Sequence, residues 1–179
     1  MIWMKASLRM TSPMPEKSKV VVTNTTPLIA LAAATGNLEV LRALYTRVVV
    51  PYEVADEIRA GGKEAFGLDV FQQASWLEIN PAPVILPPYL QNTLDRGEAS
   101  VIQTALENGI TKVCIDETIG RRVARLSNLN VTGSIGILLK AKSMGYPLSI
   151  PEAINRMREH GVWLSQEVIR FALENRGGA

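Results

Sequence analysis

The 179-residue sequence predicts an α/β protein, a three-layer α/β/α sandwich with a central parallel sheet of about five strands. Short β-branched runs alternate with longer helical patterns, which is the order expected when helices connect and cover parallel strands. The run KVCI at residues 112–115 is apolar enough for the centre of such a sheet. A composition of 47% hydrophobic and 20% charged residues is typical of a globular protein, and the length suits one domain with a substantial core.

Start and stop signals bound the elements of the first half. Thr26 fits a helix cap with Pro27 at the first helical position, where a missing amide hydrogen costs nothing. Gly36 and the pair Gly61-Gly62 end helices. In order, we expect a strand at residues 20–23, helices at 27–35 and 38–45, a strand at 47–50, helices at 52–59 and 63–74, and a strand at 76–79.

The second half begins with a proline-rich stretch, NPAPVILPPY at residues 80–89, for which we expect a loop or an extended edge segment. Asp95 caps a helix that Gly109 closes, and Ser134 caps another that Gly145 ends. In order, we expect a helix at residues 95–107, a strand at 112–115, a helix at 117–127, a strand at 130–132, and helices at 134–144, 151–159 and 165–174.

Composition excludes several kinds of chemistry. Cys114 and His160 are the only residues of their types, so no internal disulfide, cysteine-rich zinc site or histidine-pair motif can form. The net charge of +2 comes from residues 1–19, which carry four basic residues and one acid and leave the remainder at −1. We expect a poorly ordered tail at residues 1–18, one domain at 19–179, a cytoplasmic location and no membrane span.

Polar residues follow two strands where parallel sheets place their ligand sites. Such sites lie beyond the carboxyl ends of the strands, near the point where strand order reverses. Asn24 follows the first strand and Asp116 the fourth, so the two face each other if these strands are neighbours. Glu117 comes next, at the start of a helix, and helix capping explains Asp116 and Glu117 equally well.

Two further acids lie on helices. Glu98 lies on the apolar face of its helix, where a carboxylate is costly unless a partner neutralises it; the alternative is a capping box with Asp95. Glu57 lies at the margin of a buried face, whereas Glu53 and Asp56 are expected to be solvated. Clustered oxygen ligands of this kind select Mg²⁺ or Mn²⁺, ions that activate water and offset the charge of a phosphoryl transition state.

Four segments, taken in order, resemble the PIN domain, and most closely the prokaryotic subgroup allied to VapC-type toxins of toxin–antitoxin pairs. They are VVVTNTTPLIALAAATGNLEVL, VVVPYEVADEI, LDRGEASVIQTALENG and CIDETIGRRVARLSNLNVTGSIGILLKAKSMG, and they span roughly residues 20 to 170. The resemblance implies a parallel-sheet α/β/α fold that cleaves RNA with Mg²⁺ or Mn²⁺, by in-line attack of water on a phosphodiester. It also implies an antitoxin partner and a homodimer, for which the apolar stretch at residues 27–44 offers a face, although core packing explains most of that stretch.

The resemblance assigns site residues by position. The metal-binding positions fall at Asn24, Glu57, Glu98 and Asp116, with Glu117 as a further acid and Thr26 as the supporting hydroxyl. Asn24 departs from the family pattern, since an amide oxygen can bind a metal but brings no charge. Arg121 shares a helix face with Arg125 and is placed either to hold RNA phosphates or to be paired or solvated.

Three functions therefore follow from the sequence. The first is a Mg²⁺- or Mn²⁺-dependent ribonuclease, the toxin of a toxin–antitoxin pair. The second is a PIN-like module that binds RNA or a partner protein with weak or no catalysis. The third, a small-molecule or phospho-receiver domain, is weakened because no acid ends the first strand and no glycine-rich phosphate loop is present.

Overall fold

The computed structural model describes residues 19–62 and 65–177, so the tail expected at residues 1–18 lies outside the described residues. Five parallel strands form one sheet in the order β3-β2-β1-β4-β5. The strands are β1 (Val20–Thr23), β2 (Arg47–Val50), β3 (Glu78–Ile79), β4 (Lys112–Cys114) and β5 (Asn130–Thr132). The predicted parallel sheet is confirmed, with β3 two residues shorter at its start than expected.

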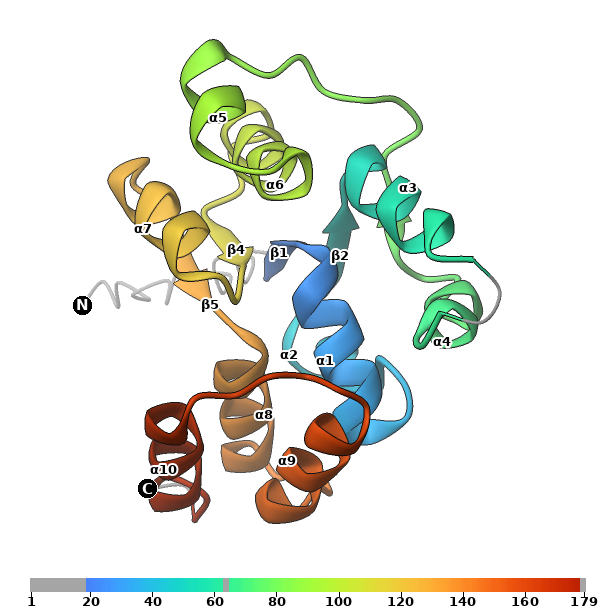
Figure 1. Cartoon of the computed structure of the whole chain (residues 1–179), viewed down its shortest axis with the longest axis vertical. Coiled ribbons are helices and arrows are strands. Elements are labelled where there is room, and N and C mark those ends of the chain that lie inside the picture. The colour runs from blue at the N-terminus through green and yellow to red at the C-terminus, as the bar shows by residue number, and fades with distance from the viewer. Residues whose placement is uncertain (1–18, 63–64, 178–179) are drawn as a thin grey trace, which may run out of the picture.

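Helices cover both sides of the sheet (Figure 1), which confirms the three-layer fold. One side carries α5 (Pro88–Thr93), α6 (Arg96–Glu107) and α7 (Thr118–Leu126). The other carries α1 (Thr25–Thr35), α2 (Glu39–Leu44), α8 (Ser134–Ser143), α9 (Ile150–Glu159) and α10 (Gln166–Glu174). The helices α3 (Tyr52–Ala60) and α4 (Leu68–Gln73) lie beside the β2 end of the sheet. Over the described ranges, no helix has the length and apolarity that crossing a membrane requires.

The first helix is buried on nearly all sides, as its apolar sequence predicts. Residues 30–34 of α1 are at most 3% exposed, because α8 and α9 pack against the helix. The next helix, α2, packs against α8 in the same way. The apolar stretch at residues 27–44 is therefore largely covered by the chain's own helices, which favours the core-packing explanation of that stretch over a dimer face.

Two expected helix caps are wrong. The N-cap of α1 is Asn24 and not Thr26, because the chain enters the helix directly from β1. The N-cap of α8 is Gly133, so Ser134 is the first helical residue. The proline-rich stretch is a loop over residues 80–87, as expected, and only its last two residues join α5, which starts at Pro88, a position where proline suits a helix.

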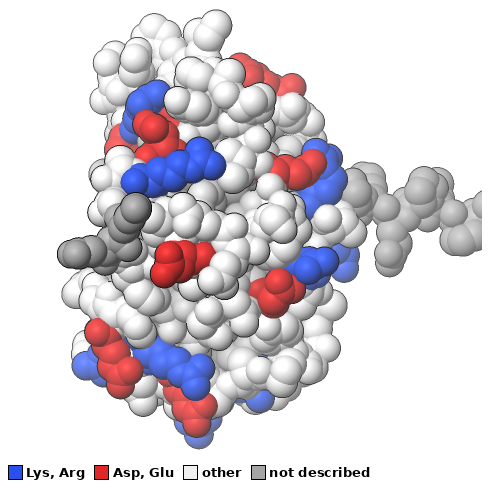
Figure 2. Space-filling model, turned by 90° about the vertical axis from the view of Figure 1, so that its right-hand side faces the viewer, with Lys and Arg blue, Asp and Glu red and all other residues white. Residues whose placement is uncertain are grey.

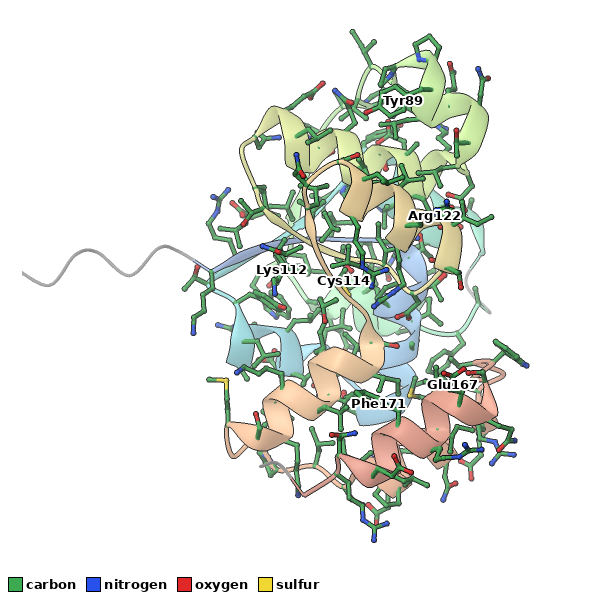
Figure 3. All side chains as sticks on the ribbon, turned by 90° about the vertical axis from the view of Figure 1, so that its left-hand side faces the viewer. Tyr89, Lys112, Cys114, Arg122, Glu167 and Phe171 are labelled. Carbon is green, nitrogen blue, oxygen red and sulfur yellow. The ribbon has the colours of Figure 1, made fainter. Side chains whose placement is uncertain are left out.

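The sheet order places β1 and β4 side by side, the relation on which the predicted site depends. The chain leaves β1 towards β2 and leaves β4 towards β5, so strand order reverses between them. The Asn24 amide donates to the Cys114 carbonyl at 3.1 Å, which extends this pairing one residue past β1. Cys114 itself is fully buried in the sheet (Figure 3), as expected for a small core residue.

Candidate functional site

Polar side chains from four parts of the chain meet beyond the carboxyl ends of β1 and β4. We call them the acidic cluster, which consists of Asn24, Glu57, Asp95, Glu98, Asp116 and Glu117. Asn24 is its most buried member, 3% exposed, and its side chain makes no capping bond to α1. The side chain is therefore free to interact with the acids around it.

Glu117 is held by the start of α1. Asn24 Nδ2 donates to one carboxylate oxygen of Glu117 at 3.3 Å, and Thr26 Oγ1 donates to the other. Glu117 occupies the N-cap position of α7, yet its side chain makes no capping bond there. A side-chain capping bond therefore does not account for the position of the Glu117 carboxylate, which accepts a hydrogen bond from Thr26 instead.

The carboxylate of Glu57, on α3, and the side-chain oxygen of Asn24 both lie against Gly97 of α6. Thr25 Oγ1 donates to Glu57 Oε2 at 2.9 Å. A Cβ atom added to Gly97 would lie 2.9 Å from Glu57 Oε2 and 3.1 Å from Asn24 Oδ1, so these two oxygens are at most about 6 Å apart. The same atom would lie 3.4 Å from Asp95 Oδ1. Gly97 thus lets α6 approach the oxygens of Glu57 and Asn24, which a side chain there would displace, while Asp95 Oδ1 would stay in ordinary contact.

Glu98 is buried, 6% exposed, at the start of α6. Its backbone amide donates to Asp95 Oδ1 at 2.8 Å, which confirms Asp95 as the helix cap. Glu98 Oε1 has no hydrogen-bond partner within residues 19–62 and 65–177, so capping does not account for the whole carboxylate. Burial, and then the charges of Asp95 and Glu117, raise the pKa of Glu98 to about 7.

Asp116 faces the start of α8. Its Oδ1 accepts a hydrogen bond from the Ser134 amide at 2.7 Å, and burial raises its pKa despite this bond. Arg121 Nη1 donates to the Ile115 carbonyl at 2.8 Å, and its charge lowers the pKa of Asp116 in part. A Cβ atom on Gly133 would touch both Asp116 Oδ1, at 2.6 Å, and Arg121 Nη1, at 2.8 Å. Arg121 therefore lies beside Asp116 and is held by the Ile115 carbonyl, while its neighbour Arg122 is exposed (Figure 3).

The cluster is not a preformed metal cage. Among the described residues, no three acidic, histidine or cysteine side chains are arranged so that they could hold an ion. The donor set nevertheless fits a hard cation, because the buried oxygens Asn24 Oδ1 and Glu98 Oε1 have no partner in the described part of the chain. Gly97 and Gly120 leave space beside them, and a Cβ on Gly120 would lie 2.5 Å from Glu98 Oε1. Binding would require side-chain rotations, above all of Asp116.

Several residues of the site escape prediction from the sequence. No sequence pattern identifies Thr25 or Gly97 as a site residue, and the pattern around Asp95 indicates only a helix cap. A glycine inside a helix costs about 1 kcal/mol relative to alanine, so Gly97 and Gly120 carry a signal of close approach. A glycine inside a helix indicates that another segment packs closely against it, but the glycine does not identify the side chain that does so.

The comparisons with known proteins give the family. A family model described as a PIN domain matches residues 20–177, which is most of the chain. Neither the curated proteins nor the solved structures include a significant match to this sequence. PIN domains are generally metal-dependent nucleases, in agreement with acids gathered beyond the central strands. The sheet order, the acidic cluster and the family match agree, and the chain belongs to the PIN-domain family.

Proposed function

We propose that this protein is an endoribonuclease that hydrolyses RNA phosphodiesters with Mg²⁺ or Mn²⁺. The observation that carries this proposal is the pair of buried oxygens, Asn24 Oδ1 and Glu98 Oε1, that lack hydrogen-bond partners within the described ranges. A buried polar group without a partner costs about 1–3 kcal/mol, and a bound cation removes that cost. The ligands would come from Asn24, Glu57, Glu98, Asp116 and Glu117.

The chain's own residues orient this set. Thr26 holds Glu117, Thr25 holds Glu57, and the Ser134 amide holds Asp116. A bound ion would lower the pKa of an attacking water and offset charge on the phosphate. Since the pKa of Glu98 is about 7, this carboxyl is protonated in about half of the metal-free molecules near neutral pH, and metal affinity rises with pH.

The lack of a negative charge at Asn24 limits the metal affinity of the proposed site, and with it the activity. The Asn24 amide oxygen adds a ligand without charge, so the carboxylates must supply all the charge that binds the cation. We infer that one ion binds more strongly than a second. Replacing Asn24 with aspartate adds the charge that the family pattern has at this position.

The biological role that fits is the toxin of a toxin–antitoxin pair, active on RNA in the cytoplasm and working as a homodimer. An antitoxin protein would hold it inactive. This role rests on the four segments that resemble VapC-type toxins. A short reading frame for a DNA-binding protein immediately upstream of the gene would support this role, and growth arrest on expression, relieved by that neighbour, would test it.

The activity is tested with labelled single-stranded and structured RNAs, in Mn²⁺, in Mg²⁺ and in EDTA. We expect wild type to cleave only with metal, Asp116→Asn to lose at least about 100-fold, and Asn24→Asp to gain. The matched control is Glu159→Gln, a change to an exposed acid on α9. All variants are compared by thermal unfolding, so that misfolding is recognised.

The alternative function is a PIN-like module that binds RNA or a partner protein without cutting. Asn24 favours it, because this position carries no acid, and so does the lack of a preformed metal cage among the described residues. If purified, folded wild type cleaves none of the RNAs with either metal, the ribonuclease proposal is wrong and this alternative replaces it.

A further inference from the structure

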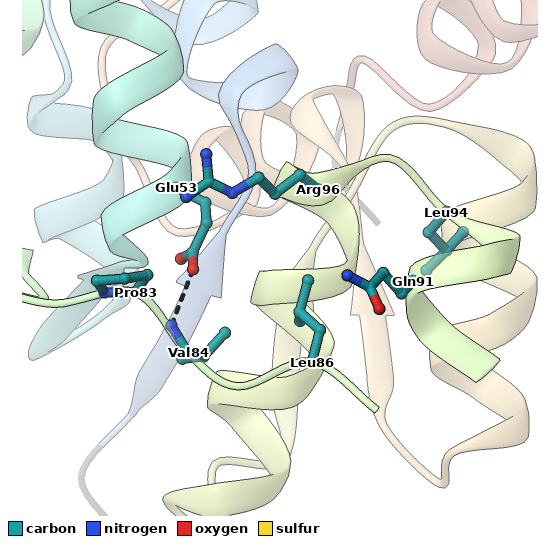
Figure 4. A pocket seen from close by; sticks show the side chains of 7 residues that line it. All are labelled: Glu53, Pro83, Val84, Leu86, Gln91, Leu94 and Arg96. Atoms are coloured by element: carbon teal, nitrogen blue, oxygen red, sulfur yellow. Dashed lines mark hydrogen bonds between the residues drawn. The ribbon is translucent and has the colours of Figure 1, made fainter. Parts of the chain in front are cut away.

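A second polar site lies one helical turn from the acidic cluster. Glu53 precedes Glu57 by four residues on α3, so both lie on one face of the helix, about 6 Å apart along its axis. Beside Glu53 lies a pocket of about 260 Å³ (Figure 4). Its lining residues are Glu53, Pro83, Val84, Leu86, Gln91, Leu94 and Arg96. Arg96 directly follows Asp95, so the pocket borders the acidic cluster.

The pocket contains a carboxylate with an unused oxygen. Glu53 is only 4% exposed, so the expectation that it is solvated is wrong. Its Oε1 accepts from the Val84 amide at 2.8 Å, whereas Oε2 has no hydrogen-bond partner in residues 19–62 and 65–177. Figure 4 shows the carboxylate turned towards the loop that carries Val84. Because each oxygen can accept two hydrogen bonds, a ligand with two adjacent N–H donors would satisfy this group once a side-chain rotation turned the buried Oε2 into the pocket.

The other walls restrict which ligand fits. Val84, Leu86 and Leu94 are apolar and suit a flat ring. Arg96 brings a positive charge to the same pocket, which disfavours a lysine or arginine side chain as the ligand of Glu53. A neutral base avoids this repulsion. Among the bases, guanine presents two adjacent donors, N1–H and N2–H₂, on its Watson–Crick edge, the edge by which single-stranded RNA is read.

We propose that this pocket binds a guanine base of the RNA through two hydrogen bonds to the Glu53 carboxylate. Arg96, 61% exposed in its side chain and 3.9 Å from Asp56, contacts a neighbouring phosphate. The proposal rests on the proposed ribonuclease function and adds its selectivity. RNA with a guanine next to the scissile phosphodiester is the preferred substrate, because the pocket borders the acidic cluster.

Binding in EDTA tests the pocket without cleavage. The probes are fluorescent five-nucleotide RNAs of uridine with guanosine, adenosine or uridine at the centre. We expect wild type to bind the guanosine probe about tenfold more tightly than the others, as one bidentate base contact allows. Glu53→Gln should lose this preference while still accepting from the Val84 amide, and Glu159→Gln should keep it.

A second variant protects the test against misfolding of Glu53→Gln. Leu86→Trp fills the pocket from the surface loop without changing Glu53, and it should remove the preference as well. Equal affinity of wild type for the three probes overturns the proposal. It is also overturned if N-acetylarginine amide displaces the guanosine probe better than guanosine monophosphate does, since the occupant would then be a protein side chain.

The two proposals fail in different ways. Metal-dependent cleavage with no guanosine preference leaves the ribonuclease standing and removes the pocket's role. A guanosine preference that depends on Glu53, in a protein that cleaves nothing, keeps the pocket and favours the binding module over the enzyme.

Discussion

The two ends of the sheet carry opposite charges and use them differently. At the carboxyl ends of β1 and β4 lies the acidic cluster, whose members Asn24 and Glu98 are at most 6% exposed. At the amino ends lies a groove of about 940 Å³, and none of its described lining residues is acidic. Its basic members are Lys19, Arg47, Lys112 and Lys140, of which Figure 3 shows Lys112 at the start of β4.

The two ends differ in how far their charged side chains are exposed to solvent. In the basic groove, Lys19, Arg47 and Lys140 are exposed, and Arg47 is paired with Glu78 at 2.8 Å. Exposed charges of this kind contribute little free energy to an interaction and discriminate weakly between ligands. The surface over α3 and α4 likewise carries small mixed groups of both signs (Figure 2). Buried acids are costly, and sites that shift pKa values in this way are where chemistry concentrates. The comparison therefore favours the acidic end as the place of the proposed catalysis.

Removing one buried charge from the acidic cluster should have the largest effect. Glu98→Gln keeps the shape of the side chain but removes the negative charge beside Asn24 and Glu117, so we expect at least about a 100-fold loss of metal-dependent cleavage. The unfolding temperature of the metal-free variant at pH 8 should rise or stay unchanged, because a costly buried charge is gone. Loss of both activity and stability would mean that Glu98 is structural, and the comparison would fail.

Closing the space at Gly97 should have the next largest effect. In Gly97→Ala the new methyl group meets Glu57 Oε2 at 2.9 Å and Asn24 Oδ1 at 3.1 Å, so both oxygens must move. We expect cleavage and Mn²⁺ affinity to fall by about tenfold, as for other changes that displace a metal ligand indirectly. Gly177→Ala is the control, since nothing lies within 4 Å of its added Cβ. Equal effects of the two substitutions would contradict the proposed role of the space.

The sequence predicts which strand ends carry this site better than it predicts the contacts between the side chains of the site. Asn24 and Asp116 could be paired from the sequence on the condition that strands one and four are neighbours, as in the common doubly wound order, and the structure has this pairing. Gly97 could not be placed, since its neighbours include Glu57 on α3 and Asn24 at the end of β1, and Glu53 could not be placed, since its partner comes from the loop at residues 80–87. Helix periodicity locates the face of a residue, but the packing of distant segments decides whether that face is covered.

A smaller effect concerns pH and the stability of the metal-free protein. The pKa of Glu98 is raised from 4.5 to about 7, so the folded state binds this proton more tightly than the unfolded chain. Its contribution to stability is full below pH 4.5 and is lost as pH rises through 7. In EDTA, the unfolding temperature of wild type relative to Glu98→Gln should fall by a few degrees between pH 5 and pH 8, measured by calorimetry. A flat difference would show that Glu98 titrates normally.

The smallest effect is expected at the basic groove. Lys112→Ala and Lys140→Ala lie at the opposite end of the sheet from the acidic cluster, so cleavage of a five-nucleotide RNA should change less than about twofold. Long RNA can reach both ends, and there the same variants should weaken binding mainly by flattening its dependence on salt. The measurement is the cleavage rate of short and long substrates at two salt concentrations. A tenfold loss on the short substrate would place the groove within the active site and abolish the division between the two ends.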